Sequence, residues 1–381
     1  MAHKTYNVNK DRLLAAFFDL VKIDSETEQE EEIGRELKNL FGGLGLDVFE
    51  DDTKTITGHG SGNLFFTLEA SPGLENRGTI FFTCHMDTVK PGKGIRPRID
   101  KDGYIRSDGT TILGSDDKAG LAALLEVIRT LKEKKIAHGR IQFIITAGEE
   151  SGLIGARALD PELVQAKYGF AVDSTGKVGG ICIAAPAQTK IDVNIIGKSA
   201  HAGVNPEDGI SAIQVASKAI SRMPLGRIDF ETTANIGKFA GGFATNIVCE
   251  TVSIAAEARS LDNKKLDRQV EAMQNAFVAT AAEFGATAEV TVLRMYPGFK
   301  LNEKDEVVQI AKRAIVNAGL QPSTFHSGGG SDANVFNGYG IPTVNLALGY
   351  EHIHTTKEQI AVQSLLDAAE VVLAIIREHA A

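Results

Sequence analysis

The segment "RIQFIITAGEESGLIG" (residues 140–155) joins a run of apolar and β-branched residues to a turn that carries two adjacent carboxylates, Glu149 and Glu150. The run before Ala147 has the length and composition of a buried strand. Two neighbouring carboxylates repel each other, and burying them is costly unless a cation lies beside them. The segment therefore predicts both a strand of a buried sheet and a charged site at the end of that strand.

Strands and helices alternate on both sides of this segment. Helical periodicity is expected over residues 10–42 and 118–135, and short apolar runs typical of strands lie at residues 63–70, 79–87, 140–147 and 168–175. Several of these runs are apolar on both faces, as in strands of a parallel sheet that helices cover on two sides. The pattern predicts an α/β fold with a mostly parallel central sheet flanked by helices.

The pattern changes near residue 187. The following segments have the order β-α-β-β-α-β, with strands expected at residues 189–198, 233–240, 246–261 and 287–295 and helices at residues 209–223 and 267–284. This order resembles a small ferredoxin-like α/β sandwich. After Pro297 the first pattern resumes, with a helix at residues 305–319, a strand at 342–348 and a helix at 361–379. We therefore expect a first domain formed by residues 1–187 and 297–381, with an inserted domain at residues 188–296.

The composition excludes several classes of protein. The chain has 381 residues, of which 43% are hydrophobic and 23% charged, as in an ordinary globular protein. Its formal charge of −9 argues against a nucleic-acid partner, and no apolar run approaches the ~20 residues of a membrane span. The N-terminal stretch lacks the long apolar core of a secretion signal. The scattered cysteines Cys84, Cys182 and Cys249 suit a reducing compartment, so we expect a cytoplasmic protein.

Acidic residues and histidines follow several of the predicted strands or begin a predicted helix. They are His85 and Asp87 in "TCHMDTV", Asp116 and Asp117 in "LGSDDKAG", Glu149 and Glu150, Asp173 in "FAVDST", and His352 and His354 in "GYEHIHTTKE". Each of these sites alone has an ordinary explanation, such as helix capping or loop solvation. Loops at the carboxyl ends of strands converge in open α/β sheets, however, and these loops contain few cationic side chains besides Lys118.

A divalent metal is the simplest partner for such a cluster. Imidazole and carboxylate ligands without thiolates suit zinc, with cobalt or manganese as alternatives. The chain offers more carboxylates than one zinc ion can use, which indicates a two-metal site of the kind that serves hydrolysis.

Six segments occur in an order and with a spacing that resemble the M20 metallopeptidases: "TCHMDTV", "SDGTTILGSDDKAG", "TAGEESGLIGA", "AVDSTG", "GKSAHAGVNPEDG" and "LGYEHIHTTKE". The resemblance covers essentially the whole chain and is strongest to the peptidase T (tripeptide aminopeptidase) branch. It implies a zinc-exopeptidase type of catalytic domain, with the inserted domain acting as a lid or dimerisation domain. A homodimer through the inserted domain is thereby implied as well.

The resemblance also implies a role for each matching side chain. The metal ligands would be His85 and Asp173 for the first ion, Glu150 and His354 for the second, and Asp116 as a bridge between them. Glu149 would be the general base that takes a proton from the metal-bridging water and passes it to the leaving amine. Asp87 would orient His85. His352 is the alternative to His354. The family places a glutamate four residues after this histidine, and Glu358 in that position favours His354.

Three further matches lie in the inserted domain. His201 matches a histidine that reaches the partner's active site in related dimers and helps to stabilise the oxyanion. Asn246 and Arg259 match positions that contact substrate, and the Arg259 guanidinium could hold a peptide carboxylate with two hydrogen bonds. For Arg259 a surface salt bridge is the alternative interpretation. The segment "HSGGGSDANVF" (residues 326–336) resembles the Gly-rich loop that the family places near its substrate.

The implied activity is the release of the N-terminal residue from short peptides, with tripeptides and also dipeptides as substrates. The linker at residues 90–109 is shorter than that of peptidase T proper, which speaks against a strict preference for tripeptides. A carboxypeptidase or N-acyl-amino-acid deacylase is the alternative within the family. An inactive peptide-binding relative is a further alternative, which the presence of Glu149 and of every ligand position disfavours.

Overall fold

The computed structural model describes residues 7–381, so the first six residues of the stretch expected to lack a secretion signal lie outside the described part. The chain forms two compact units. One contains the residues up to Ala184 together with 301–327 and 331–381, and the other contains residues 185–300 and 328–330. The junctions at 184/185 and 300/301 lie three residues before and four residues after the expected boundaries at 187 and 296.

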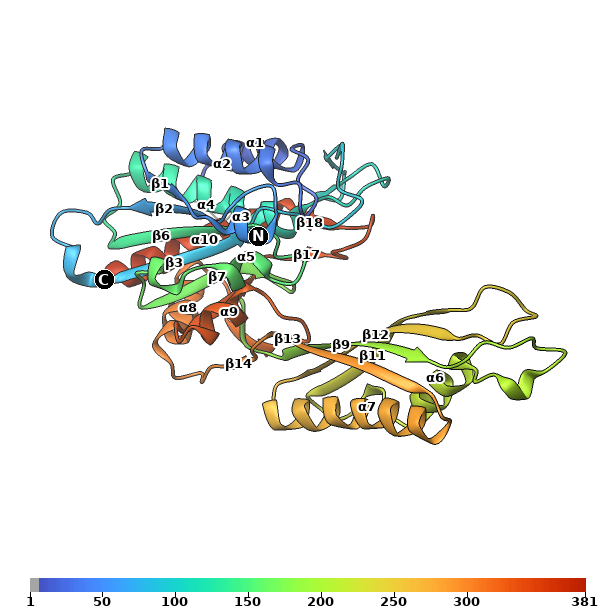
Figure 1. Ribbon diagram of the computed structural model, residues 1–381. Coiled ribbons are helices and arrows are strands. Elements are labelled where there is room, and N and C mark those ends of the chain that lie inside the picture. The colour runs from blue at the N-terminus through green and yellow to red at the C-terminus, as the bar shows by residue number, and fades with distance from the viewer. Residues whose placement is uncertain (1–6) are drawn as a thin grey trace. The chain divides into compact units, whose positions relative to one another are not determined.

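The larger unit is built on a mixed sheet with the strand order β1-β2-β6-β3-β7-β16-β8, and β15 lies beside β8. Figure 1 shows β1, β2, β6, β3 and β7 following one another in this order. β6, β3, β7 and β16 are parallel neighbours, whereas β1, β2 and β8 pair in antiparallel fashion. The strands are β1 (Asp47–Glu50), β2 (Leu64–Leu68), β3 (Thr79–His85), β6 (Arg140–Thr146), β7 (Tyr168–Ser174), β8 (Gly180–Ala185), β15 (Ser323–His326) and β16 (Thr343–Ala347).

Helices cover this sheet on both faces. They are α1 (Lys10–Val21), α2 (Glu31–Gly43), α3 (Thr53–Thr57), α4 (Ser115–Glu133), α5 (Ile154–Ala158), α8 (Glu306–Asn317), α9 (Asp332–Gly338) and α10 (Val362–Ala380). α1, α2, α4, α8 and α10 contribute to the main hydrophobic core, whereas Phe336 of α9 packs with Phe65, Phe81 and Ile144 in a separate cluster. β3 and β6 are buried along almost their whole length, as expected for central strands of a doubly covered sheet. The predicted α/β fold is thereby confirmed.

A small antiparallel sheet with the order β17-β18-β5-β4 belongs to the same unit. Its strands are β4 (Arg98–Ile99), β5 (Tyr104–Arg106), β17 (Tyr350–Glu351) and β18 (Gln359–Ala361). The turn between β17 and β18 contains His352 and His354. This sheet was not expected from the sequence, because its strands are two or three residues long and carry no periodic pattern.

Two expected elements differ in the structure. The helix expected over residues 10–42 is interrupted between Val21 and Glu31, where the backbone of Ser25 and Thr27 pairs with Thr88 instead. The strand expected at residues 246–261 begins only at Thr251. In both cases backbone groups find hydrogen-bond partners far along the chain, which local periodicity does not reveal.

The smaller unit has one antiparallel sheet with the order β10-β11-β12-β9-β13. The strands are β9 (Ala187–Ile196), β10 (Gly226–Arg227), β11 (Thr232–Gly241), β12 (Thr251–Ser260) and β13 (Thr287–Tyr296), and the helices are α6 (Ala212–Ser221) and α7 (Asn263–Glu283). Apolar side chains of α6 and α7 pack with those of the sheet in one core. Apart from the short β10, the chain order is the predicted β-α-β-β-α-β. The two-residue strand β14 (Phe299–Lys300) precedes the second junction.

Within residues 7–381, no helix combines the length and the apolar character needed to cross a membrane.

Candidate metal centre

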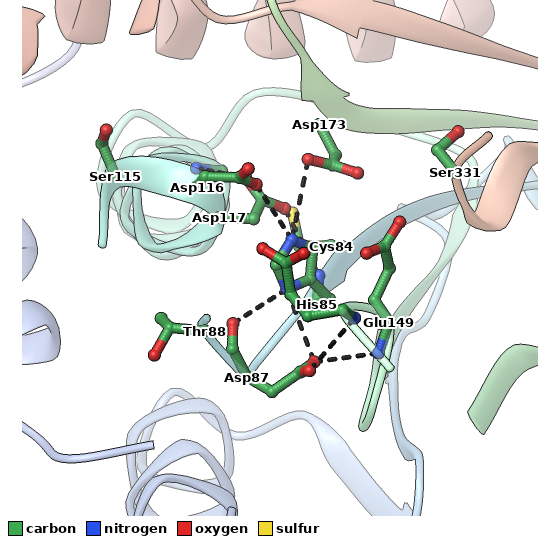
Figure 2. A network of polar contacts seen from close by, with 12 residues as sticks. Cys84, His85, Asp87, Thr88, Ser115, Asp116, Asp117, Glu149, Asp173 and Ser331 are labelled. Atoms are coloured by element: carbon green, nitrogen blue, oxygen red, sulfur yellow. Dashed lines mark hydrogen bonds and ion pairs between the residues drawn. The ribbon is translucent and has the colours of Figure 1, made fainter. Parts of the chain in front are cut away.

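The carboxyl ends of the parallel strands bring the predicted ligands to one edge of the large sheet. His85 is the last residue of β3, and Asp173 is the next-to-last residue of β7. Glu149 and Glu150 follow β6, and Asp116 stands at the start of α4. Figure 2 shows the Asp116 and Asp173 carboxylates converging on the His85 imidazole. This edge is where open α/β sheets place their binding sites.

Asp116 lies between two imidazoles. Its Oδ1 is 3.0 Å from Nε2 of His85, and its Oδ2 is 3.4 Å from Nε2 of His354. On one side, Asp173 Oδ1 lies 3.7 Å from the same His85 nitrogen. On the other side, Glu150 Oε1 lies 3.0 Å from the same His354 nitrogen. The five groups thus form two half-sites that share one carboxylate.

The protonation of His85 follows from its other ring nitrogen. Nδ1 lies 2.9 Å from the backbone carbonyl oxygen of Asp87, which can only accept, so Nδ1 carries a proton. In the neutral ring Nε2 then carries no proton, and its lone pair faces the carboxylate oxygens of Asp116 and Asp173. Acceptors that face one another require a proton or a cation between them. This donor set fits a divalent metal ion held by imidazole nitrogen and carboxylate oxygen.

The turn after β6 presents Glu149 and Glu150 together. Gly148 has φ of +69°, and a Cβ at this position would lie 2.5 Å from the His59 ring, so the turn requires glycine. The backbone N–H groups of Glu149 and Glu150 then donate to the two oxygens of the Asp87 carboxylate, at 3.0 and 3.2 Å. Figure 2 shows the Glu149 side chain beside His85.

Burial and mutual repulsion perturb the carboxyl groups. Desolvation, reinforced by Asp173 and Glu150 and opposed by His85, raises the pKa of Glu149 well above its ordinary value. Desolvation and Asp116 likewise raise the pKa of Asp173. Asp116 is the exception among the predicted ligands: burial acts to raise its pKa, but in the metal-free site the protonated rings of His354 and His85 donate to it and lower that pKa. The same bonds to Asp116 and Glu150 raise the pKa of His354 to about 10.

Cationic side chains do not neutralise this cluster. Within residues 7–381, the ion pairs of Asp116, Glu150 and Asp173 are formed with histidines and with no lysine or arginine. The buried Lys118 ammonium donates to Ser25, and desolvation lowers its pKa to about 8. Divalent metal ions are therefore the cations that the site accommodates.

Asp117 is a further carboxylate near the first half-site. His85, Asp117 and Asp173 each offer a ligand atom within 4.8 Å of the others, as do His85, Asp116 and Glu150. Asp117, however, accepts hydrogen bonds from the backbone N–H groups of His85 and Gly120, at 3.3 and 3.2 Å. Backbone N–H groups thus occupy both Asp117 oxygens, whereas the Asp116 oxygens face the two imidazoles, and the expected role of Asp116 as a ligand stays a prediction.

The alternatives for the last histidine are separated by geometry. His354 lies against Asp116 and Glu150, whereas the described contacts of His352 include neither of these residues. The His352 carbonyl oxygen accepts from Thr355 Oγ1 at 2.7 Å, and His352 is exposed. The expected preference for His354 as the ligand agrees with this arrangement, and its role stays a prediction.

Several supporting residues were missed in the sequence. The Tyr350 hydroxyl donates to Asp173 Oδ1 at 2.9 Å, and His59 Nε2 lies 2.9 Å from Ser151 Oγ behind the glutamate turn. Glu358 holds the backbone of the Asp116 loop. In the sequence, Glu358 served only as the residue whose spacing selects His354, and Tyr350 lies in the same segment; neither signal predicted these contacts.

In the smaller unit, His201 and Asn246 lie on paired segments. His201 forms an isolated bridge with Ile247, and the Asn246 carbonyl oxygen accepts from the N–H of Ala202 at 3.0 Å. Asn246 precedes the start of β12 at Thr251, whereas Arg259 lies near the other end of this strand. At ~3.3 Å per residue, Arg259 is about 25–30 Å from Thr251. Its guanidinium pairs with Glu257 at 2.8 and 3.2 Å. Within this unit, the structure brings His201 and Asn246 together but not Arg259.

Comparisons with known proteins place the chain in a family. Residues 81–378 match peptidase family M20/M25/M40. The uncharacterized protein YqjE of Bacillus subtilis (strain 168) is 59% identical over 373 residues, which cover 98% of this chain and 100% of that protein. The crystal structure of aminopeptidase PepT from Bacillus cereus ATCC 10987 has a TM-score of 0.90 at 60% identity and covers 98% of this chain and 100% of its own.

The structure of a tripeptidase from Staphylococcus aureus subsp. aureus Mu50 has a TM-score of 0.94 at 51% identity and covers 98% and 99% of the two chains. The predicted resemblance to the peptidase T branch is confirmed by these relatives. The chain belongs to peptidase family M20/M25/M40, and the prediction of an enzyme is thereby confirmed.

Proposed function

We propose that this member of peptidase family M20/M25/M40 is a two-metal aminopeptidase that removes the N-terminal residue from tripeptides and dipeptides. The observation that supports it most is the position of Asp116, whose two oxygens face two different imidazoles, His85 and His354. A carboxylate in this position can serve as a shared ligand. Relatives named aminopeptidase and tripeptidase, at 60% and 51% identity, support the choice of substrate.

We assign His85, Asp116 and Asp173 to the first metal position and Asp116, Glu150 and His354 to the second. Zinc suits this mixture of nitrogen and oxygen ligands, and cobalt and manganese are the alternatives. Metal ions at these positions would polarise the scissile carbonyl group and lower the pKa of the attacking water.

Glu149 supplies the proton transfer in this proposal. As the water oxygen bonds to the peptide carbonyl carbon, the Glu149 carboxylate takes a proton from the water. It then gives this proton to the peptide nitrogen as the carbon–nitrogen bond breaks, which releases the amine and regenerates the carboxylate. The raised pKa of Glu149 and its fixed backbone, bonded to Asp87, suit a group that must both take and give a proton.

We further propose that the smaller unit completes the site in a homodimer. His201 would donate to the oxyanion of the partner's substrate, with Asn246 beside it, because these two residues share one end of the unit. Arg259, which is already paired with Glu257, would bind a peptide carboxylate only by exchanging that partner. The cytoplasmic location stays a prediction.

The test is a panel of dipeptides, tripeptides and N-acylated amino acids, incubated with protein freed of metal and then supplied with zinc, cobalt or manganese. We expect metal-dependent hydrolysis in which the N-terminal residue is the first product. Release of the C-terminal residue, or hydrolysis of the acylated amino acids alone, would indicate the carboxypeptidase or deacylase alternative. Less than one bound metal per chain, with no hydrolysis restored by any of the three metals, would indicate an inactive peptide-binding relative.

A further inference from the structure

Glu358 is a buried carboxylate just outside the metal positions. It is 1% exposed, and it accepts four hydrogen bonds from one short segment of a distant part of the chain. Its Oε2 accepts from the N–H groups of Leu113 and Gly114, both at 2.8 Å. Its Oε1 accepts from Ser115 Oγ at 2.6 Å and from the N–H of Asp116 at 3.0 Å.

These donors belong to the loop that presents Asp116. Gly114 is in the left-handed region at φ +74°, and Asp116 and Asp117 have non-helical backbone angles although they stand at the start of α4. Backbone N–H groups at such a helix start have no partner within the helix. The Glu358 carboxylate supplies that partner from outside, so the position of Asp116 depends on it.

Glu358 also anchors the turn that carries His354. His352 and His354 both have positive φ, 57° and 62°, which is unfavourable for residues with a Cβ. The ends of the turn are fixed by the pairing of Glu351 with Gln359 and of Tyr350 with Ile360. Besides the His354 side chain itself, Glu358 ties this turn to the Asp116 loop.

We propose that Glu358 is a positioning residue that sets the placement of Asp116 relative to His354, and through it the affinity of the second metal position. This inference rests on the two-metal site proposed above. Both Asp116 and His354 depend on Glu358, whereas His85 and Asp173 of the first position are held by central strands of the large sheet. Loss of the Glu358 carboxylate should therefore weaken the second position more than the first.

Replacement by glutamine is a sharp probe of this role. If the amide nitrogen takes the place of Oε2, it faces two backbone N–H groups, which can only donate and cannot accept a hydrogen bond from it. In the other orientation it faces the N–H of Asp116 and the hydroxyl of Ser115, which can turn and accept. The second orientation is favoured, so the unsatisfied donor falls on Asp116 itself.

The experiment is a competition titration of metal-free protein with zinc and a fluorescent chelator, for wild type, Glu358→Gln and Glu351→Gln. Glu351 lies on β17 of the same hairpin and is exposed, so its variant is the matched control. We expect two equivalents in wild type and in Glu351→Gln. In Glu358→Gln the equivalent that His354→Ala also removes should lose about 10–100-fold in affinity, the usual effect of removing a residue that orients a ligand, while the other equivalent changes less.

Equal affinities of Glu358→Gln and wild type for both equivalents would overturn the inference. So would an equal loss at both positions, which a merely structural role predicts. If Glu358→Gln does not fold, Ser115→Ala replaces it, since this change removes one of the four bonds without leaving a buried N–H donor. We then expect a several-fold loss of affinity at the equivalent that His354→Ala removes, and unchanged affinity there would overturn the inference. A wild-type protein that binds fewer than two equivalents would instead overturn the two-metal site, and the inference with it.

Discussion

The backbone N–H of Glu149 donates a hydrogen bond of 3.0 Å to the Asp87 carboxylate, which stands 62 residues earlier in the chain. The same carboxylate lies 3.5 Å from Nδ1 of His85. Asp87 is fully buried, and although burial acts to raise its pKa, the contact with His85 holds that pKa below its ordinary value. One charged group therefore fixes both the proposed base and a proposed metal ligand.

Removal of this carboxylate should lower both catalysis and metal content. Asp87→Ala frees the glutamate turn and His85 together, and we expect kcat to fall about 10–100-fold or more, with a smaller fraction of bound metal. Steady-state kinetics and metal analysis on the same preparation would measure both effects. Unchanged kcat with full metal content would show that the turn and the imidazole hold their positions without Asp87.

The contacts of Asp87 could be predicted from the sequence only in part. Strand periodicity predicted that His85 and Asp87 point to one place, and they do contact each other, but β3 ends at His85 and the Asp87 carboxylate serves the glutamate turn as well. Long buried runs such as β3 and β6 were predictable, because central parallel strands are apolar on both faces. The bonds of Glu358 and Tyr350 were not, since they join segments whose proximity only the tertiary fold determines.

Glu149→Gln should separate proton transfer from metal binding. Glutamine has nearly the same size but cannot take the proton, so we expect kcat to fall by about 10²–10⁴-fold. Metal content should be unchanged, because Glu149 is not among the groups assigned to either metal. The comparison needs kcat and metal stoichiometry from one batch of protein. A variant that keeps more than about a tenth of wild-type kcat would contradict the assignment of the base.

The histidine pair of the β17–β18 turn offers a matched comparison. His354→Ala removes a proposed ligand that lies 3.0 Å from Glu150, so we expect the loss of one metal equivalent and of most activity. His352→Ala removes a neighbouring exposed ring with the same backbone strain, and both equivalents should remain. Metal analysis after gel filtration would distinguish the variants. The opposite result would move the ligand to His352.

Asp332 should make the metal-free protein less stable as the pH rises. It is 4% exposed, its Oδ2 accepts from Thr146, and its Oδ1 has no hydrogen-bond partner among the described residues. Burial raises its pKa to about 6. A carboxyl whose pKa is higher in the folded than in the unfolded state stabilises the fold below about pH 4 and loses this contribution as the pH rises through about 6.

Asp332→Asn cannot ionise and can still accept from Thr146. The free energy of unfolding should thus be similar for wild type and variant at pH 4. At pH 7 the variant should be more stable by on the order of 2–3 kcal/mol. Urea unfolding in the presence of a chelator at both pH values measures this difference. A gap between the two proteins that does not change with pH would show that Asp332 ionises at its ordinary pKa.

The homodimer can be tested by combining two damaged chains. His201→Ala should lower kcat by about 10²–10³-fold if its imidazole stabilises the oxyanion, and Glu149→Gln removes the base. When the two variants are co-expressed with different tags and pair at random, half of the dimers are mixed. If each site takes His201 from the partner, one of the two sites in a mixed dimer is complete, and about a quarter of wild-type activity returns. If each site uses His201 of its own chain, every site in the mixture lacks one group, and activity stays at the mean of the separate variants.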